Sequence, residues 1–348
     1  MLHLTAYIIR RLLLLPLILF GVTLIIFSFT EILGPEKMLS AYVNPNMFDK
    51  LSNEDLDKLI EQYGLNDPMW TRYFKWIGGV LKGDLGWSVT AKQPVADAIK
   101  ERIPYTIELA MYAFIPVVIV GIWLGVVAAV NRDKFIDHFI RIFAIIGWSL
   151  PDFVFGLIVL MFFYSVLGWF PPGTLSGWAE EIVKSGEFHR FTKILTIDAL
   201  INGRLDIFWD ALRHLIGPIL TISWLWWAYL LRITRSSMLE VLGKEYVRTA
   251  RAKGVPEKEV IHKHAKKNAM IPVVTVAGAM VIGLLAGTVI VEVIFNRIGM
   301  GRFTAQAATQ LDYAAILGST LFYSTLLVIG NLVIDILYAI LDPRIRLG

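Results

Sequence analysis

The sequence predicts an all-α, polytopic membrane protein with about six transmembrane helices. Hydrophobic residues make up 56% of its 348 residues, and the mean hydropathy is +0.61. Apolar runs recur at roughly the 20-residue length that crosses a bilayer as a helix. Eleven Trp and twenty Phe supply the aromatic side chains that collect at membrane interfaces. Length, hydropathy and aromatic content therefore favour the same class.

Six apolar runs account for the predicted spans, in chain order. They are Ala6–Phe29, Ile107–Val130, Phe139–Gly168, Leu215–Leu231, Ile271–Ile294 and Ile316–Leu341. Arg10 and Arg11 precede the first run, as in a signal peptide, but the run is long and no small-x-small cleavage pattern follows it. An uncleaved membrane anchor is therefore favoured. The third run is longer than one straight crossing needs, so Pro151 is expected to kink it.

The distribution of Lys and Arg predicts the orientation in the cell (inner) membrane. These residues concentrate at both chain ends, around Arg132–Arg141, and through the basic stretch Arg232–Lys267. Residues 30–104 and 169–214 instead mix basic residues with acidic ones. Because basic residues accumulate on the cytoplasmic side, both termini and the basic stretch are expected there.

The domain organisation expected from these spans has three parts. Residues 1–30 form an N-terminal transmembrane helix, residues 31–104 an extracytoplasmic loop or small subdomain, and residues 105–348 the core transmembrane domain with a cytoplasmic loop at 240–274. Within the external segment, Ser52 and Asp55 are placed to cap a helix.

The loop at 240–274 carries ordered helix signals between two apolar spans, so it must lie at a membrane surface. Residues 245–253 are good helix formers, and Gly254 suits the left-handed position that ends a helix. Pro256 suits the first position of a second helix, with Glu257 and Glu259 in its first turn. An ordinary basic loop is the alternative, but it needs neither these caps nor the small residues of TARAKG. A surface helix that docks on another protein is favoured.

The motifs of soluble enzymes are absent. The sequence has no G-x-x-x-x-G-K-[ST] loop for nucleotide phosphates, no H-E-x-x-H and no G-x-S-x-G. It has no Cys, which removes thiol catalysis and thiolate metal sites. His262 and His264 are two residues apart and lie on different faces of a helix, so no shared metal is expected. Because the basic residues cluster beside apolar spans, nucleic acid is not an expected partner.

Polar residues inside the spans are the candidates for a transport path. Glu108 lies at the outer edge of the second span, and Asn331 and Asp335 lie four residues apart, on one helical face. Such groups either join helices by hydrogen bonds or line a path for a substrate. The structural role is favoured, and the path role stays open. Trp148 and Pro151, in the motif GWSLPDF, are added to the candidate path residues.

The chain resembles the inner-membrane permease subunits of ATP-binding-cassette importers in the dipeptide, oligopeptide and nickel group. The resemblance runs over nearly the whole length. It is carried by YGLNDPMWTRYFKWIGGVLKGDLGWS, ERIPYTIELA, GWSLPDFVFGLIVLMFFYSVLGWFPPG, RSSMLEVLGKEYVRTARAKG, HKHAKKNAMIPVV and NLVIDILYAILDPRIRLG. It departs at FNRIGMGRF, where a Pro is expected before the first Gly, and at LDYA, where Arg-Asp-Tyr-Pro is expected.

The resemblance implies a type I importer permease fold whose cytoplasmic coupling helix docks in a groove of an ATPase subunit. Arg248, Thr249 and Ala250 match the family's E-A-A positions, and Gly254 matches its glycine. The implied coupling residues are Glu245, Tyr246, Arg248, Thr249, Ala250, Lys253, Gly254 and Val255. The implied partners are a second permease, two ATPases that bind ATP and Mg, an extracytoplasmic solute-binding protein and membrane lipid. No cofactor is expected in this chain, and the chain itself is not expected to be an enzyme.

The resemblance leaves the substrate open. Short peptides are expected first, with oligosaccharides or a nickel chelate as alternatives. Outside this class, an ion-coupled secondary transporter is the alternative, but such proteins usually need a midplane ion site and often show inverted repeats, and neither signal is present. A membrane-embedded enzyme is also disfavoured, because no nucleophile is paired with a base.

Overall fold

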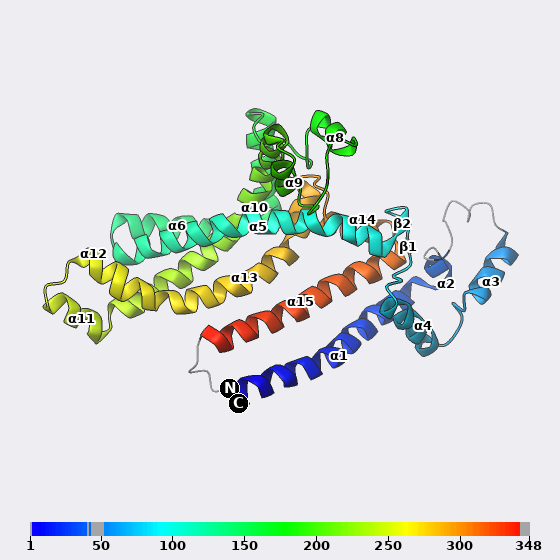
Figure 1. The fold of residues 1–348 in the computed structure, drawn as a ribbon, viewed down its shortest axis with the longest axis horizontal. Coiled ribbons are helices and arrows are strands. Elements are labelled where there is room, and N and C mark those ends of the chain that lie inside the picture. Colours follow the sequence, from blue (N-terminus) through cyan, green and yellow to red (C-terminus); the bar gives the residue numbers. More distant parts are fainter. Residues whose placement is uncertain (1, 40–41, 43–51, 342–348) are drawn as a thin grey trace. The chain divides into compact units, whose positions relative to one another are not determined.

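The computed structural model describes residues 2–39, 42 and 52–341, and the fold is built from helices (Figure 1). Five described helices are long and apolar enough to cross a membrane, and a bent pair adds a sixth span if it is counted as one. The long helices are α1 (Leu2–Thr30), α5 (Val95–Val130), α10 (Leu205–Leu242), α13 (Lys266–Ile294) and α15 (Tyr313–Leu341). The bent pair is α6 (Phe135–Ser149) followed by α7 (Asp152–Val159) and the π-helical η4 (Leu160–Val166). The predicted all-α membrane architecture is confirmed.

The third span breaks at Pro151, as predicted, but more sharply than a kink. The axes of the two halves differ by 104°. Pro disfavours helical geometry in the residue before it, and Leu150 accordingly has extended backbone angles, with φ −88° and ψ 125°. Pro151 is also extended and precedes the first residue of α7. The break therefore produces two helices in place of one.

Contacts divide the described chain into two compact units, and each is described by itself. The first contains residues 1–105 and 298–348. Besides α1, α15 and the start of α5, it holds η1 (Glu31–Leu33), α2 (Pro35–Met38), α3 (Asn53–Gln62), α4 (Met69–Leu81) and α14 (Met300–Thr309). Helix α15, grouped with the core by sequence, packs here against α1. The predicted cap of α3 is confirmed, because the Asp55 amide donates to the Ser52 hydroxyl at 3.3 Å.

The first unit also contains a short antiparallel hairpin, which an all-α structure would not have. Strands β1 (Trp87–Ser88) and β2 (Gln93–Pro94) pair in the first unit. Buried Asp312 ties this hairpin to the start of α15. Its carboxylate accepts hydrogen bonds from the Ser88 hydroxyl at 2.6 Å, the Thr90 amide at 2.8 Å and the Ala315 amide at 3.1 Å. These bonds cap α15 and tie the hairpin to its first turn.

The second unit contains residues 106–297 and is organised around α10. This helix packs against α6, α7, α9 (Leu195–Ile201) and α13. The unit also holds α8 (Gly177–Lys184), α11 (Glu245–Ala252), α12 (Glu257–Glu259) and the π-helical η5 (Val260–Ala265), which leads into α13. The α5–α10 approach depends on Gly125, because a Cβ built there would lie 2.5 Å from the Thr234 Cβ and 2.8 Å from the Leu231 carbonyl oxygen. A residue without a side chain is required at such a crossing.

Candidate functional site

The loop between α10 and α13 is an ordered helix–turn–helix, as the sequence predicted. Helix α11 ends in a Schellman motif: the Val255 amide donates to the Ala250 carbonyl at 3.3 Å, and the Gly254 amide donates to the Arg251 carbonyl at 2.9 Å. Gly254 has φ +79°, the left-handed conformation predicted for it. Pro256 differs by one position from the prediction, because it precedes α12 and does not form its first residue. The backbone hydrogen bonds and the left-handed conformation of Gly254 therefore fix the geometry of the turn.

An ion pair joins the two sides of this turn. The Arg251 guanidinium donates to both carboxylate oxygens of Glu257, at 2.6 and 3.0 Å. This hydrogen-bonded guanidinium lowers the pKa of the Glu257 carboxyl below its usual value. Because both groups are largely solvated, the pair contributes little to overall stability, and its effect is to orient α12 relative to α11.

The inner face of α11 is apolar and packs on its own chain. Val247 and Ala250 are buried in a cluster with Met238 of α10, Val260 of η5 and Ala269 of α13. Ala250, one of the residues implied to take part in coupling, is buried, with its side chain against this cluster. Val255 is partly buried against the same cluster. These contacts join α11 to two spans, α10 and α13.

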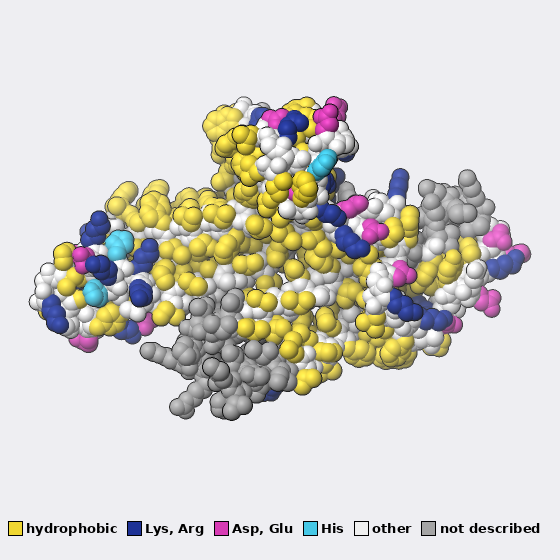
Figure 2. All heavy atoms as spheres, viewed as in Figure 1, with side chains coloured by type: hydrophobic (Ala, Val, Ile, Leu, Met, Phe, Trp, Pro, Cys, Tyr) yellow, Lys and Arg dark blue, Asp and Glu magenta, His cyan; other side chains and the backbone are white. Residues whose placement is uncertain are grey.

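The outer face of α11 carries the remaining predicted coupling residues. Glu245, Tyr246, Arg248, Thr249, Lys253 and Gly254 are all exposed. The Arg248 guanidinium donates to the Glu245 carboxylate at 2.9 Å, and the Thr249 hydroxyl donates to the Glu245 carbonyl at 3.0 Å. Lys and Arg side chains gather around this end of the molecule (Figure 2). Six of the eight residues named as coupling residues are therefore exposed.

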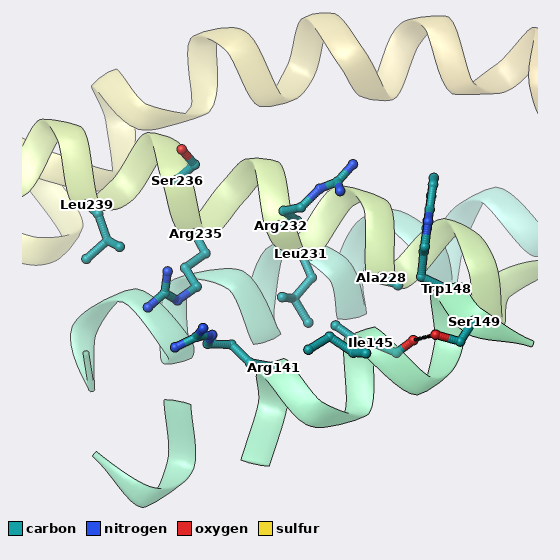
Figure 3. A pocket seen from close by; sticks show the side chains of 11 residues that line it. Arg141, Ile145, Trp148, Ser149, Ala228, Leu231, Arg232, Arg235, Ser236 and Leu239 are labelled. Carbon is teal, nitrogen blue, oxygen red and sulfur yellow. Dashed lines mark hydrogen bonds between the residues drawn. The ribbon is translucent and has the colours of Figure 1, made fainter. Parts of the chain in front are cut away.

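A pocket of about 460 Å³ opens between α6 and α10 (Figure 3). Its lining combines apolar side chains with Trp148 and three arginines, Arg141, Arg232 and Arg235. Arg235 is neutralised by a bidentate ion pair with the fully buried Asp137, with both N–O distances at 2.7 Å. No carboxylate of the described residues lies within ion-pair distance of Arg141 or Arg232. The pocket is therefore positively charged.

Two aromatic rings hold the Arg232 side chain at this pocket. Its guanidinium carbon lies 5.2 Å from the centroid of the Trp148 ring and 5.7 Å from that of Tyr229. The rings of Trp148 and Tyr229 stack on each other at 6.2 Å. Figure 3 shows Arg232 and Trp148 pointing to the same side of α10. Such cation–π contacts stabilise a guanidinium without neutralising it, so the charge stays available to an anionic ligand.

Glu108 lies in a different setting, a fully buried polar cluster. One carboxylate oxygen accepts hydrogen bonds from the Thr196 amide and hydroxyl, both at 2.8 Å. The other accepts from the Arg297 guanidinium at 2.5 Å. In the last turn of α13, buried Glu292 accepts a hydrogen bond from the Thr106 hydroxyl at 2.7 Å. Glu108 therefore joins α5 to α9 and to the residues just after α13, and it presents no surface to a path in this structure.

The five candidate path residues are divided between the two units. Glu108, Trp148 and Pro151 belong to the second unit, whereas Asn331 and Asp335 belong to the first. Asn331 is exposed on α15; Asp335 lies in the same helix, but its side chain is outside the described part of the chain. Sequence reasoning missed Arg232 and Arg297 as site residues. Arg232 follows a span on the predicted cytoplasmic side and is indistinguishable from a positive-inside residue until its neighbours are known. Arg297 is recognised only through its buried contact with Glu108.

The fold is that of a polytopic helical membrane protein with an ordered helix–turn–helix between two of its spans. Residues 121–347 match the family described as the inner membrane component of binding-protein-dependent transport systems. The chain belongs to this family.

Curated relatives match over almost the full length. A dipeptide transport system permease protein of Escherichia coli (strain K12) is 39% identical over 98% of both chains. An oligopeptide transport system permease protein of Bacillus subtilis (strain 168) is 38% identical over 98% of this chain and 99% of its own. A di/tripeptide transport system permease protein of Pseudomonas aeruginosa is 36% identical over 98% of both chains.

Proposed function

We propose that this chain is the membrane-spanning permease subunit of an ATP-driven importer of short peptides. The observation that carries the proposal is the Schellman-capped helix α11, which presents an exposed polar face outward and an apolar face to two spans. Three relatives with full-length similarity are named as dipeptide, di/tripeptide or oligopeptide permeases, which supports peptides ahead of oligosaccharides or a nickel chelate.

In this proposal, α11 is the coupling helix. Two cytoplasmic ATPase subunits bind ATP and Mg, and one of them receives the outer face of α11, including Tyr246, Thr249 and Gly254. Closure of the ATPases moves α11, and the buried contacts of Val247 and Ala250 pass this movement to α10 and α13. ATP drives transport only through its differential affinity for the two conformations of the complex. This chain acts as the mechanical partner and not as the ATPase.

The orientation follows from the same assignment. The loop with α11 and α12 lies in the cytoplasm, together with both termini, and residues 31–104 lie on the opposite side of the membrane. A solute-binding protein delivers the peptide at that opposite side. A second, related permease completes the path across the membrane.

The pocket at Trp148 and Arg232 is proposed as part of that path. A peptide carries a carboxylate at its C-terminus, and Arg232 offers an uncompensated guanidinium beside two aromatic rings. Pro151 contributes by breaking the span next to this pocket. Glu108 contributes indirectly, because its buried ion pair holds the outer ends of the surrounding helices together.

Transport by the reconstituted complex tests the proposal. The chain is combined in vesicles with its partner permease, ATPases and binding protein, and uptake of a labelled dipeptide is measured with and without ATP. ATP-dependent uptake that requires the binding protein is expected. Uptake that instead follows a proton or sodium gradient without ATP would identify a secondary transporter and overturn the proposal.

A further inference from the structure

Helix α4 follows the first span and lies in the segment that the sequence assigned to an extracytoplasmic loop. Its Tyr73 hydroxyl is hydrogen-bonded to the Thr23 hydroxyl of α1 at 2.8 Å. Thr23 lies inside the apolar window Leu12–Phe29 of that span. Six residues separate Thr23 from the end of this window, which corresponds to about 9 Å of helix. Tyr73 thus contacts α1 well below the end of its membrane-spanning part.

Aromatic contacts fix the depth of α4 independently. The Tyr73 ring meets the rings of Phe20 and Phe27 edge-on, with centroids at 5.7 and 5.6 Å. The ring of Trp76 lies 5.6 Å from that of Phe27. Tyr73 is fully buried by these contacts. One face of α4 is therefore packed along the outer half of the apolar span.

The neighbouring face of α4 is apolar and exposed. Trp70, Phe74 and Leu81 are 54%, 59% and 82% exposed, and Ile77 between them is partly buried. The spacing of four, three and four residues aligns all four side chains in one stripe. The rings of Trp70 and Phe74 stack at 6.5 Å, so the stripe is preformed. A helix in a water-facing loop would not expose so many large apolar side chains in one stripe.

The charged residues of α4 point elsewhere and are neutralised. The Arg72 guanidinium is ion-paired with Glu31, just beyond the end of α1. The Lys75 ammonium is ion-paired with Asp67 at 2.7 Å. No acidic or basic residue of α4 falls within the stripe from Trp70 to Leu81. A helix with this division of polarity is suited to lie in a membrane interface, with its apolar face among acyl chains.

We propose that α4 is inserted in the outer leaflet of the membrane, with the Trp70–Leu81 stripe in contact with lipid acyl chains. Phe20 of α1, whose ring contacts the Tyr73 ring of α4, is itself 43% exposed and adds an apolar surface of the span beside the stripe. A lipid surface is favoured over a protein partner because the stripe continues a face that the span itself presents to the bilayer. The inference rests on α1 crossing the membrane and not on the identity of the substrate.

The test uses the absence of Cys from the chain. Single cysteines replace Phe74, Leu81 or Lys82 in the full-length protein, are labelled with bimane, and are reconstituted in phosphatidylcholine–phosphatidylglycerol vesicles. Doxyl-labelled lipids quench labels in the acyl region, and iodide quenches labels in water. Leu81→Cys and Lys82→Cys form a matched pair, because they are adjacent in sequence but point to the stripe and to the polar side. Ile25→Cys in α1 is the lipid-exposed reference.

Phe74→Cys and Leu81→Cys are expected to lose most of their fluorescence to doxyl lipid, like Ile25→Cys, and to resist iodide. Lys82→Cys is expected to show the reverse. Quenching of Leu81→Cys by iodide to the extent seen for Lys82→Cys would show a solvated helix and overturn the proposal. Resistance of both stripe positions to both quenchers would show that the stripe is buried against protein, in this chain or a second copy, and would overturn the proposal as well. Since two stripe positions are labelled separately, failure of one variant to fold leaves the other to decide.

Discussion

The carboxylate of Glu108 and the guanidinium of Arg297 form a fully buried ion pair with an N–O distance of 2.5 Å, although the two residues are 189 positions apart in the sequence. The pair joins α5 to the residues just after α13, and the Thr196 bonds add α9. Within the described structure, Nε and Nη1 of Arg297 have no hydrogen-bond partner. The guanidinium therefore depends strongly on Glu108, since a buried charge without compensation is costly.

Breaking this pair is expected to destabilise the protein severely. Glu108→Gln leaves the Arg297 charge buried and uncompensated, a situation that costs roughly 3–5 kcal/mol. The double variant Glu108→Gln, Arg297→Met removes both charges and is expected to recover a large part of the loss. Thermal unfolding of the purified protein in detergent measures both effects. A double variant no more stable than Glu108→Gln alone would contradict the role assigned to the pair.

Substitution of Gly254 is expected to stop coupled transport. A Cβ at this position meets nothing within 4 Å in the chain, but φ is +79°, so a β-branched residue is strained by roughly 1–2 kcal/mol. Gly254→Val adds bulk where the ATPase docks, and ATP-driven uptake should be lost while membrane insertion is retained. Gly254→Asn separates the two causes, because Asn tolerates left-handed backbone.

Uptake and stimulation of ATP hydrolysis by loaded binding protein are measured together for these variants. Gly254→Asn is expected to show intermediate uptake, since its side chain still projects toward the partner. Lys258→Gln, on the solvated flank of the turn, serves as the control and should be close to wild type. Normal transport by Gly254→Val would remove the loop from the coupling mechanism.

The Arg251–Glu257 ion pair is expected to protect the Schellman turn from opening. Arg251→Ala and Glu257→Ala should speed hydrogen exchange at the Val255 amide by similar factors, and the double variant should add little to either one. The pair also predicts a pH dependence: the Glu257 pKa is lowered in the folded state, so its contribution is complete above the usual Glu pKa and is lost as the pH falls through the lowered value. Additive effects of the two substitutions would indicate that the residues act separately.

Trp148 and Arg232 are expected to affect uptake without affecting assembly. Trp148→Ala removes a ring that holds the guanidinium, and Arg232→Gln removes the charge while keeping a polar side chain. Peptide uptake should fall several-fold in both variants, with normal yield of the complex. Arg132→Gln, in the turn before α6, is the matched control for loss of a positive charge. A reduced complex yield that accounts for the lost uptake would assign the two residues to packing alone.

The orientation is tested by labelling in intact cells. Because Ser52 caps α3, cysteine is better placed at exposed Glu54, two residues further on. An impermeant thiol reagent should label Glu54→Cys and leave Lys258→Cys unlabelled until the cells are permeabilised. The opposite pattern would place the helix α11 loop outside the cell and contradict the proposed orientation.

Backbone chemistry explains why the local structure of the loop at 240–274 was predicted well. Gly254 and Pro256 restrict their own dihedral angles, so the turn is encoded locally and can be read from a few residues. The same reasoning found the Ser52 cap and the break at Pro151. It erred by one position at Pro256, and it did not separate Ala250, which is buried, from its exposed neighbours, because burial depends on α10 and α13.

The sequence by itself therefore determined the class of protein, the positions of the spans and the local structure of the turn, since these follow from hydropathy and from the conformations that Gly and Pro permit. Only the tertiary structure decided that Glu108 pairs with Arg297, that Arg232 lies against the rings of Trp148 and Tyr229, and that α4 packs alongside the first span. Each of these depends on contacts between helices distant in sequence. The charge and hydropathy of each residue can be read from the sequence, but the partner that offsets the cost of burying a charge is known only from the fold.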